Sequence, residues 1–146
     1  MPAQPLRLRA EDTDDLIVVS AALQDALFVV GDLTFDRHAR RFIAGVNRFR
    51  WERARGRGGD ERVRAALSVE TVLSVKSRNL RLGARDSVGA LLDIQFVAAG
   101  EPPGGVLNLM LGGGGEISLG VECIDVTLTD LGAPWPTLNR PDHERA

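Results

Sequence analysis

The spacing of apolar residues changes once early in the chain, from a helical repeat to an alternation of period two. Leu16, Val19 and Leu23 recur at the spacing of one helix face. Asp12 precedes them as a favourable N-cap, and two more aspartates follow in the first turn, where the helix dipole favours negative charge. We therefore predict a helix over about residues 12–25 with its apolar face on a sheet.

Further along the chain, the alternation of apolar and polar residues is typical of β-strands joined by short turns. The predicted strands cover residues 27–35, 41–51, 63–75, 90–98, 106–111 and 116–129. The first strand is interrupted at Gly31, where we expect a bulge or bend, and a polar turn over 36–40 joins it to the second. In the sixth strand the apolar phase slips near Cys123, which indicates a bulge or a bend between two sheets.

One helix followed by about six strands predicts an α+β fold. We expect the N-terminal helix to pack on an antiparallel meander that is curled or barrel-like. The 146 residues suffice for a single domain and show neither a repeat nor a linker. The ordered part is expected over about 6–132, followed by an extended tail over 133–146 with three prolines. Trp135 in this tail either caps the sheet or anchors a partner.

Hydrophobic residues make up 44% of the chain and charged residues 26%, which is the balance of a soluble globular protein. This balance argues against a disordered chain and a membrane protein. The formal net charge of −2 provides no general attraction to nucleic acid or acidic lipid. The longest apolar stretch, 16–23, is far shorter than the ~20 residues that span a bilayer, and the N-terminus has no apolar signal segment. We therefore expect a cytoplasmic protein without membrane association.

Cysteine and histidine are too scarce to support a metal site. Cys123 is the only cysteine, so no intrachain disulfide can form and the chain fits a reducing compartment. The two histidines, His38 and His143, lie far apart, and no short-spaced pair of ligands occurs. We therefore expect neither a metal nor a cofactor.

Arginine accounts for 17 of the 18 basic residues and is concentrated in residues 48–64. That segment has a formal charge of +4, which leaves −6 for the rest of the chain. The predicted binding residues are Arg48, Phe49, Arg50, Trp51 and Arg53. Aromatic rings among arginines are typical of a partner surface or a single-strand nucleic-acid site, but they also occur where arginine stems shield rings at a solvated hairpin end. Without a nucleic-acid motif and with a negative net charge, nucleic-acid binding is the weaker hypothesis.

Other candidate groups form no catalytic constellation. The glycine run 112–115 favours a hairpin turn over an anion site, because a strand rather than a helix follows it. Asp32, Asp36 and His38 lie near one hairpin as possible acid–base groups, but His38 falls in the turn itself. Cys123 lies in an apolar strand, which indicates a buried thiol. The sequence leans towards a non-enzymatic role without deciding it.

Four segments carry a resemblance to a known family: residues 16–26, 30–33, 41–52 and 121–132. They resemble short alphaproteobacterial proteins catalogued only as a domain of unknown function. The stretch Asn47-Arg-Phe-Arg-Trp-Glu52 is the most recognisable, and the resemblance covers about residues 6–143. It implies a cytoplasmic bacterial protein and supplies no activity, substrate or catalytic residue.

The leading hypothesis is a non-enzymatic protein-interaction or scaffolding module that acts through a protein partner or self-association. Replacing Arg48, Arg50 and Arg53 by glutamate is then expected to weaken the interaction without unfolding the domain. One alternative is a small-molecule-binding protein or enzyme with a pocket between helix and sheet, its polar groups among Asn47, Arg48 or Asp32. The other is single-stranded nucleic-acid binding at the arginine-rich hairpin end, with an affinity that falls steeply with salt.

Overall fold

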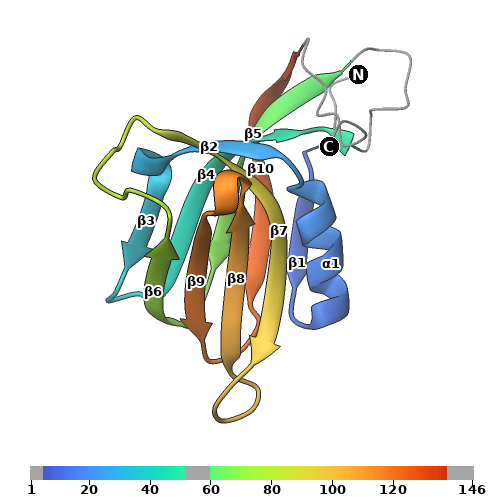
Figure 1. Ribbon diagram of the computed structural model, residues 1–146. Coiled ribbons are helices and arrows are strands. Elements are labelled where there is room, and N and C mark those ends of the chain that lie inside the picture. The colour runs from blue at the N-terminus through green and yellow to red at the C-terminus, as the bar shows by residue number, and fades with distance from the viewer. Residues whose placement is uncertain (1–4, 52–59, 138–146) are drawn as a thin grey trace.

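The computed structural model of the protein describes residues 5–51 and 60–137, which contain one α-helix and ten β-strands (Figure 1). The helix is α1 (Thr13–Ala22), and two short 3₁₀ turns are η1 (Val30–Asp32) and η3 (Gly112–Gly114). The strands are β1 (Arg7–Ala10), β2 (Ala26–Val29), β3 (Leu33–Asp36), β4 (Arg41–Phe49), β5 (Glu61–Val69), β6 (Val72–Arg78), β7 (Val88–Ala98), β8 (Gly105–Leu111), β9 (Glu116–Val121) and β10 (Val126–Pro136). All of them belong to one sheet of antiparallel pairs, which confirms an α+β fold.

Helix α1 begins where the sequence predicts and ends earlier. Oδ1 of Asp12 accepts a hydrogen bond from the backbone N–H of Asp15 at 2.8 Å, which satisfies one of the free amides of the first turn. Leu16 and Val19 are buried, as predicted. Asp25, with a positive φ of 61°, then turns the chain into β2. No helix of the described ranges is long and apolar enough to cross a membrane.

The prediction of about six strands is wrong: three predicted strands are each divided in two, and β1 is an additional strand. The first is divided by η1, at the bend predicted near Gly31. The third is divided at Thr71, where a positive φ of 57° separates β5 from β6. The sixth is divided between Val121 and Val126, so the phase slip near Cys123 marks a bend. A tight turn without glycine or proline, such as the one at Thr71, leaves the apolar alternation nearly intact and is therefore hard to see in the sequence.

The strand order is β1-β10-β5-β4-β2-β7-β8-β9-β6, with β3 also paired to β4. It contains two meanders, β3-β4-β5 and β7-β8-β9, and β2 joins them because it pairs with both β4 and β7. Strand β10 lies between β1 and β5, so the sheet is not one continuous meander. The sheet curls strongly, but β1 and β6 are not paired with each other and it does not close into a barrel.

The curled sheet leaves two places where strands face each other without pairing. Helix α1 covers the first, because it packs against both β1 and β7, and Figure 1 shows it beside β1. Ser20 ties the helix to β7: its Oγ donates to Oδ1 of Asp93 at 2.7 Å and accepts from the N–H of Ile94 at 3.0 Å. The second place lies between β3 and β6, and there a groove remains, which we call the β3–β6 groove.

The core lies on the inner face of the curl. Leu67, Leu107, Leu119 and Leu128, from β5, β8, β9 and β10, are completely buried. Phe28 of β2 is also buried, and its ring occupies the space that a side chain at position 89 would need, so that position requires glycine. Because the core fixes the inner face, the alternate residues of each strand face outward.

Candidate functional site

The arginine-rich segment predicted to bind a partner lies at the end of β4 and the start of β5, and its described side chains are largely buried. Arg48 and Phe49 are completely buried, and Arg50 is 8% exposed. Trp51 is half-buried, and Arg53 lies outside the described residues. Arg48 and Arg50 therefore do not form an exposed basic surface, because the alternation along β4 places Arg48 on the inner face of the sheet.

Arg48 makes a two-pronged ion pair with Asp130 of β10. Its Nε lies 2.7 Å from Oδ1 and its Nη2 lies 2.8 Å from Oδ2, with both side chains almost completely buried. Oδ2 of Asp130 also accepts the backbone N–H of Leu6 at 2.8 Å, which fixes the chain that leads into β1. Planar, doubly hydrogen-bonded geometry is what offsets the cost of removing two charges from water. The pair therefore holds β4, β10 and β1 together.

Two further arginines complete what we call the inner arginine cluster (Arg48, Arg50 and Arg62). Nη1 of Arg50 lies 3.2 Å from Oε1 of Glu61. Nη1 of Arg62 donates to the carbonyl of Asn47 at 3.0 Å, and its guanidinium lies 5.8 Å from the centre of the Phe49 ring. Burial lowers the pKa of Arg62, an effect that the nearby Asp25 carboxylate opposes. These cations are thus engaged with carboxylates, carbonyls and a ring of the same chain.

The two aromatic residues of the predicted site contact each other and the fold. The rings of Phe49 and Trp51 lie 4.6 Å apart at 59°, and Nε1 of Trp51 donates to the carbonyl of Gln24 at 3.0 Å. Phe49 is completely buried and so presents no face on which a base could stack.

The remaining sequence candidates do not converge. Asp32 pairs with Arg64 at 2.9 Å, whereas Oδ1 of Asp36 accepts the N–H groups of His38 and Ala39, both at 3.0 Å. These backbone hydrogen bonds, that of Ala39 first, lower the pKa of Asp36. The glycine run 112–115 forms the turn between β8 and β9, as the hairpin interpretation predicts.

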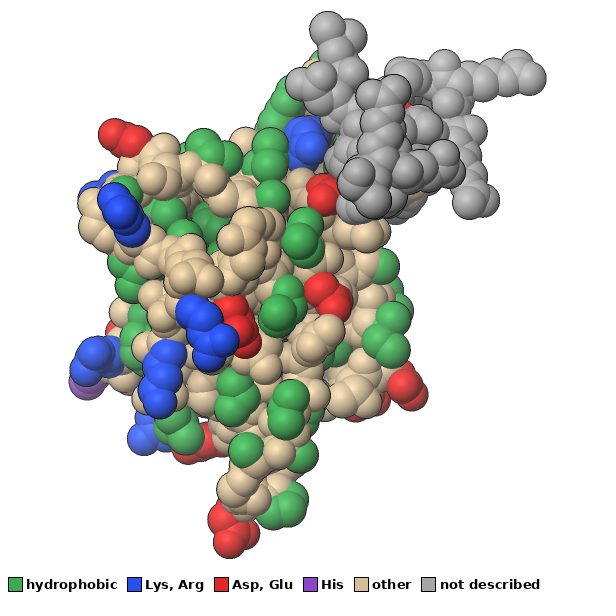
Figure 2. Space-filling view, in the orientation of Figure 1, with side chains coloured by type: hydrophobic (Ala, Val, Ile, Leu, Met, Phe, Trp, Pro, Cys, Tyr) green, Lys and Arg blue, Asp and Glu red, His purple; other side chains and the backbone are tan. Residues whose placement is uncertain are grey.

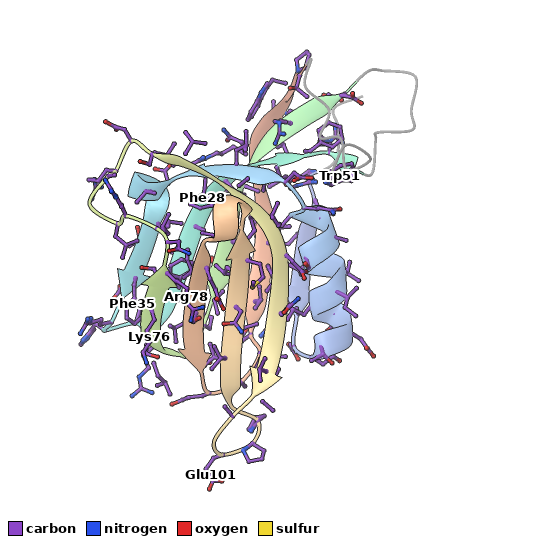
Figure 3. The ribbon with its side chains drawn as sticks, viewed as in Figure 1. Phe28, Phe35, Trp51, Lys76, Arg78 and Glu101 are labelled. Atoms are coloured by element: carbon purple, nitrogen blue, oxygen red, sulfur yellow. The ribbon has the colours of Figure 1, made fainter. Side chains whose placement is uncertain are left out.

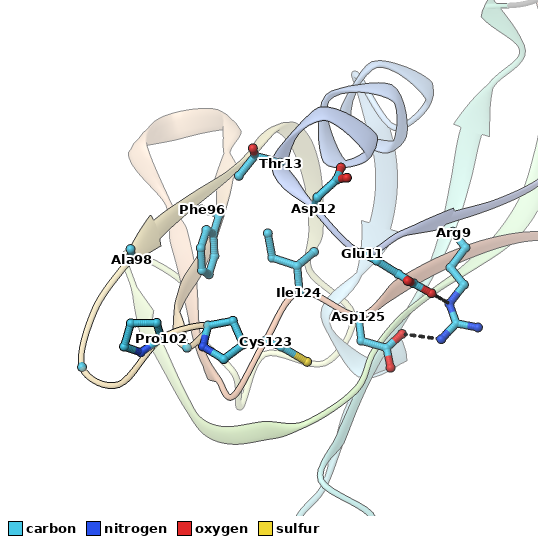
Figure 4. A pocket seen from close by; sticks show the side chains of 13 residues that line it. Arg9, Glu11, Asp12, Thr13, Phe96, Ala98, Pro102, Cys123, Ile124 and Asp125 are labelled. Atoms are coloured by element: carbon cyan, nitrogen blue, oxygen red, sulfur yellow. Dashed lines mark ion pairs between the residues drawn. The ribbon is translucent and has the colours of Figure 1, made fainter.

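An open pocket of about 610 Å³ lies beside the first turn of α1 (Figure 4). Phe96, Ile124 and two prolines of the 99–104 loop give it an apolar floor, and Arg9 is paired at its rim with Glu11 at 3.0 Å and Asp125 at 3.5 Å. Cys123 also lines this pocket and is half-buried rather than buried. The pocket lies between helix and sheet, as one alternative predicts, but with polar groups other than those expected.

The β3–β6 groove has a volume of about 630 Å³. Its lining residues are Phe35, Arg37, Arg40, Val72, Leu73, Ser74, Val75 and Leu82. Three of these residues, Phe35, Val75 and Leu82, also line a deeper cavity of about 170 Å³ that reaches the core at Phe42 and Ile117. The groove therefore opens on apolar groups that belong to the inner face of the sheet.

Hydrogen bonds close the groove at both ends and leave its sides open. At one end, the N–H of Val72 donates to the carbonyl of Arg40 at 2.8 Å. At the other, the loop over 79–87 is fixed to η1, where the N–H of Gly31 donates to the carbonyl of Arg85 at 2.9 Å. Between these points the facing edges of β3 and β6 pair with no strand of the described chain.

Basic side chains surround this groove (Figure 2). Arg40 and Arg41 are paired, with Glu122 at 3.0 Å and Glu70 at 2.6 Å. Lys76, Arg78 and Arg81 are exposed and form no ion pair within residues 5–51 and 60–137, and we call these three the outer basic patch. Figure 3 shows Lys76 and Arg78 of β6 on the same side of the molecule as Phe35 of β3.

Sequence reasoning missed the outer basic patch, although the signal was present. Lys76 is the only lysine, and it alternates with Val75 and Ser77 in the period-two pattern of a strand. That pattern places Lys76 and Arg78 on one face, opposite the face that carries Val75. The seven arginines of residues 48–64 are a stronger signal in the sequence than these two basic residues on one strand face.

The fold is that of an α+β domain built on one open, curled antiparallel sheet with a single helix. The family model Protein of unknown function (DUF2948) matches residues 6–143, and the chain belongs to this family. This match confirms the resemblance to a domain of unknown function over these residues. No curated protein and no solved structure matches the chain.

Proposed function

We propose that this protein is a protein-interaction module that binds an extended segment of a partner as an added strand on β6. The observation that carries the proposal is the open edge of β6 beside the β3–β6 groove. An open edge offers a row of backbone donors and acceptors, and strand addition to such an edge is a common mode of peptide recognition.

The two end strands of the sheet differ in a way that favours β6 as the binding edge. Strand β1 has four residues and is flanked by α1, whereas β6 has seven residues and an edge that is open beyond Val72, whose N–H is bonded to Arg40. At about 3.3 Å per residue, the remaining six residues of β6 offer an edge of roughly 20 Å. Such an edge is long enough for a partner segment of about five or six residues at the strand spacing.

The groove provides the side-chain component of this recognition. Alternate side chains of an added strand face opposite sides, so every second one faces Phe35, Val75 and Leu82. The exposed Lys76 on the same strand disfavours unspecific pairing between sheet edges, which is how native sheets protect such strands. Backbone pairing then supplies affinity, and the groove supplies selectivity.

The proposal places the protein in the bacterial cytoplasm. A single cysteine with no disulfide partner supports a reducing compartment.

The test is a selection of peptides from a random library on the full-length chain, followed by mapping of the bound peptide with backbone amide shifts. We expect shift changes in β6, β3 and the 79–87 loop. Leu73→Asp is expected to abolish binding, because Leu73 lines the groove and is 56% exposed. Val97→Asp is the matched control, since Val97 is 54% exposed on β7 and outside the groove. Shifts confined to another surface would refute the proposal.

A second candidate function is small-molecule binding in the pocket beside α1. An apolar floor with charged groups at one side can hold and orient a small ligand. Native mass spectrometry of the protein purified gently from its host is expected to show a small, discrete added mass that Phe96→Asp removes. A bare chain mass would argue against this candidate.

A further inference from the structure

We infer that the segment bound at β6 is acidic, with carboxylates at alternate positions that face Lys76 and Arg78. This inference rests on the proposed strand addition and specifies the chemistry of the partner. It follows from the orientation of β6 and from the balance of charge around the groove.

The register of β6 and β9 settles which side chains face outward. Val75 lies opposite Leu119 and Ser77 lies opposite Ile117, and both partners are buried on the inner face. The alternate residues of β6, Lys76 and Arg78, are therefore on the outer face and are exposed. A strand paired to the open edge places its own outward residues about 4.5–5.5 Å from them, measured between Cβ atoms.

The described residues offset the positive charge at this edge only in part. Residues 72–87 contain four basic residues and one acidic residue. Glu116 lies opposite Arg78 in the register, but the two side chains form no ion pair among the described residues. The acidic groups at the end of the groove are already used, Glu70 and Glu122 by arginines and Asp36 by the amides of its turn.

An acidic segment matches both faces of the site. Its outward carboxylates meet Lys76 and Arg78, and its inward residues are apolar because they meet Phe35 and Leu82. Carboxylates opposite basic residues on neighbouring strands stabilise pairing, whereas lysines there oppose it. A nucleic-acid strand fits less well, because Phe35 is half-buried and no tyrosine or tryptophan lies in the groove lining.

The experiment uses three synthetic peptides in which valine alternates with glutamate, glutamine or lysine, each measured against the full-length protein by fluorescence anisotropy. We expect the glutamate peptide to bind about tenfold more tightly than the glutamine peptide, and the difference to shrink at high salt. A glutamate peptide with a central proline is expected to lose binding, because proline lacks the N–H that strand pairing needs.

The variant K76E/R78E is expected to reverse the preference towards the lysine peptide. R7E/R9E is the control for net charge, because it makes the same change at alternate exposed positions of β1, and the glutamate preference is expected to remain. Because Arg9, unlike Lys76 and Arg78, loses ion pairs with Glu11 and Asp125, thermal unfolding of this variant is measured as well.

Equal binding of all three peptides would overturn the acidic specificity and leave strand addition standing. No binding of any peptide would overturn strand addition itself. Competition by a single-stranded oligonucleotide, or a dimer in sedimentation that K76E/R78E disrupts, would overturn the inference in favour of nucleic acid or a second copy of the chain.

Discussion

The inner arginine cluster and the outer basic patch lie on separate parts of one sheet, at the ends of β4 and β5 and along the edge strand β6, and they use positive charge in opposite ways. Arg48 is completely buried, and its guanidinium donates two hydrogen bonds to the carboxylate of Asp130. Lys76 and Arg78 are exposed and have no carboxylate of the described chain within ion-pair distance. The comparison teaches that a cation fixed by its own chain serves the fold, while an unneutralised one at an open edge is available to a partner.

The largest expected effect is from Arg48→Ala, which leaves Asp130 buried without its cation. Removing one partner of a buried pair costs about 3–5 kcal/mol, so we expect the free energy of unfolding in urea to fall by that amount. Arg78→Ala is the control and is expected to change it by less than about 0.5 kcal/mol. The sequence alone predicts that Arg48 can be replaced by glutamate without unfolding the domain, and the burial of Arg48 leads us to expect the opposite. Equal stability of the two variants would remove the distinction between the regions.

A smaller loss is expected when both members of the buried pair become apolar. Arg48→Met with Asp130→Leu leaves no unpaired charge, and such replacements are often neutral or stabilising. We expect the double variant to be more stable than either single variant in a double-mutant cycle. If the double variant lost as much free energy of unfolding as the sum of the two single variants, Arg48 and Asp130 would not be energetically coupled.

An intermediate case is the carboxylate of Asp93, which is held by neutral groups. The hydroxyl of Ser20 is the main cause of its lowered pKa, followed by burial, which opposes the effect. A lowered pKa contributes stability that is present above the unfolded pKa and is lost as the pH falls through the folded pKa. Ser20→Ala is expected to cost about 1–2 kcal/mol at neutral pH and to flatten the loss of stability in acid. If the free energy of unfolding fell by the same amount between pH 7 and pH 3 in the wild type and in Ser20→Ala, this expectation would be contradicted.

The smallest expected effect on stability is that of K76Q/R78Q. Neither side chain has an ion pair within the described ranges. The free energy of unfolding, measured by thermal denaturation, is therefore expected to change by less than about 0.5 kcal/mol. Binding of the glutamate peptide is expected to weaken about tenfold. A marked loss of stability would show that Lys76 and Arg78 stabilise the fold, as the inner arginine cluster does, and would remove the contrast between the cluster and the outer basic patch.

Local signals predicted the parts of the fold that depend on neighbours in sequence. Asp12 caps the helix, Gly31 marks a bend, and the glycine run 112–115 makes a hairpin turn, because each acts over a few residues. The inward direction of Arg48 was also encoded in the alternation along β4. Its burial, however, depends on Asp130, which is 82 residues away in the chain. Composition reports where arginines are dense, whereas only the three-dimensional pairing reports which of them remain without a carboxylate.

The pairing of β1 with β10 also sets the order in which the chain can fold. Backbone and side chain of Asp130 both bind Leu6, at a separation of 124 residues. During synthesis, β1 cannot pair with β10 and Arg48 cannot bind Asp130 until the residues of β10 have emerged. Contacts so distant in sequence are formed late and slow the folding of a domain. Strand β1 is therefore made early and joins the sheet late, because its pairing depends on the synthesis of β10.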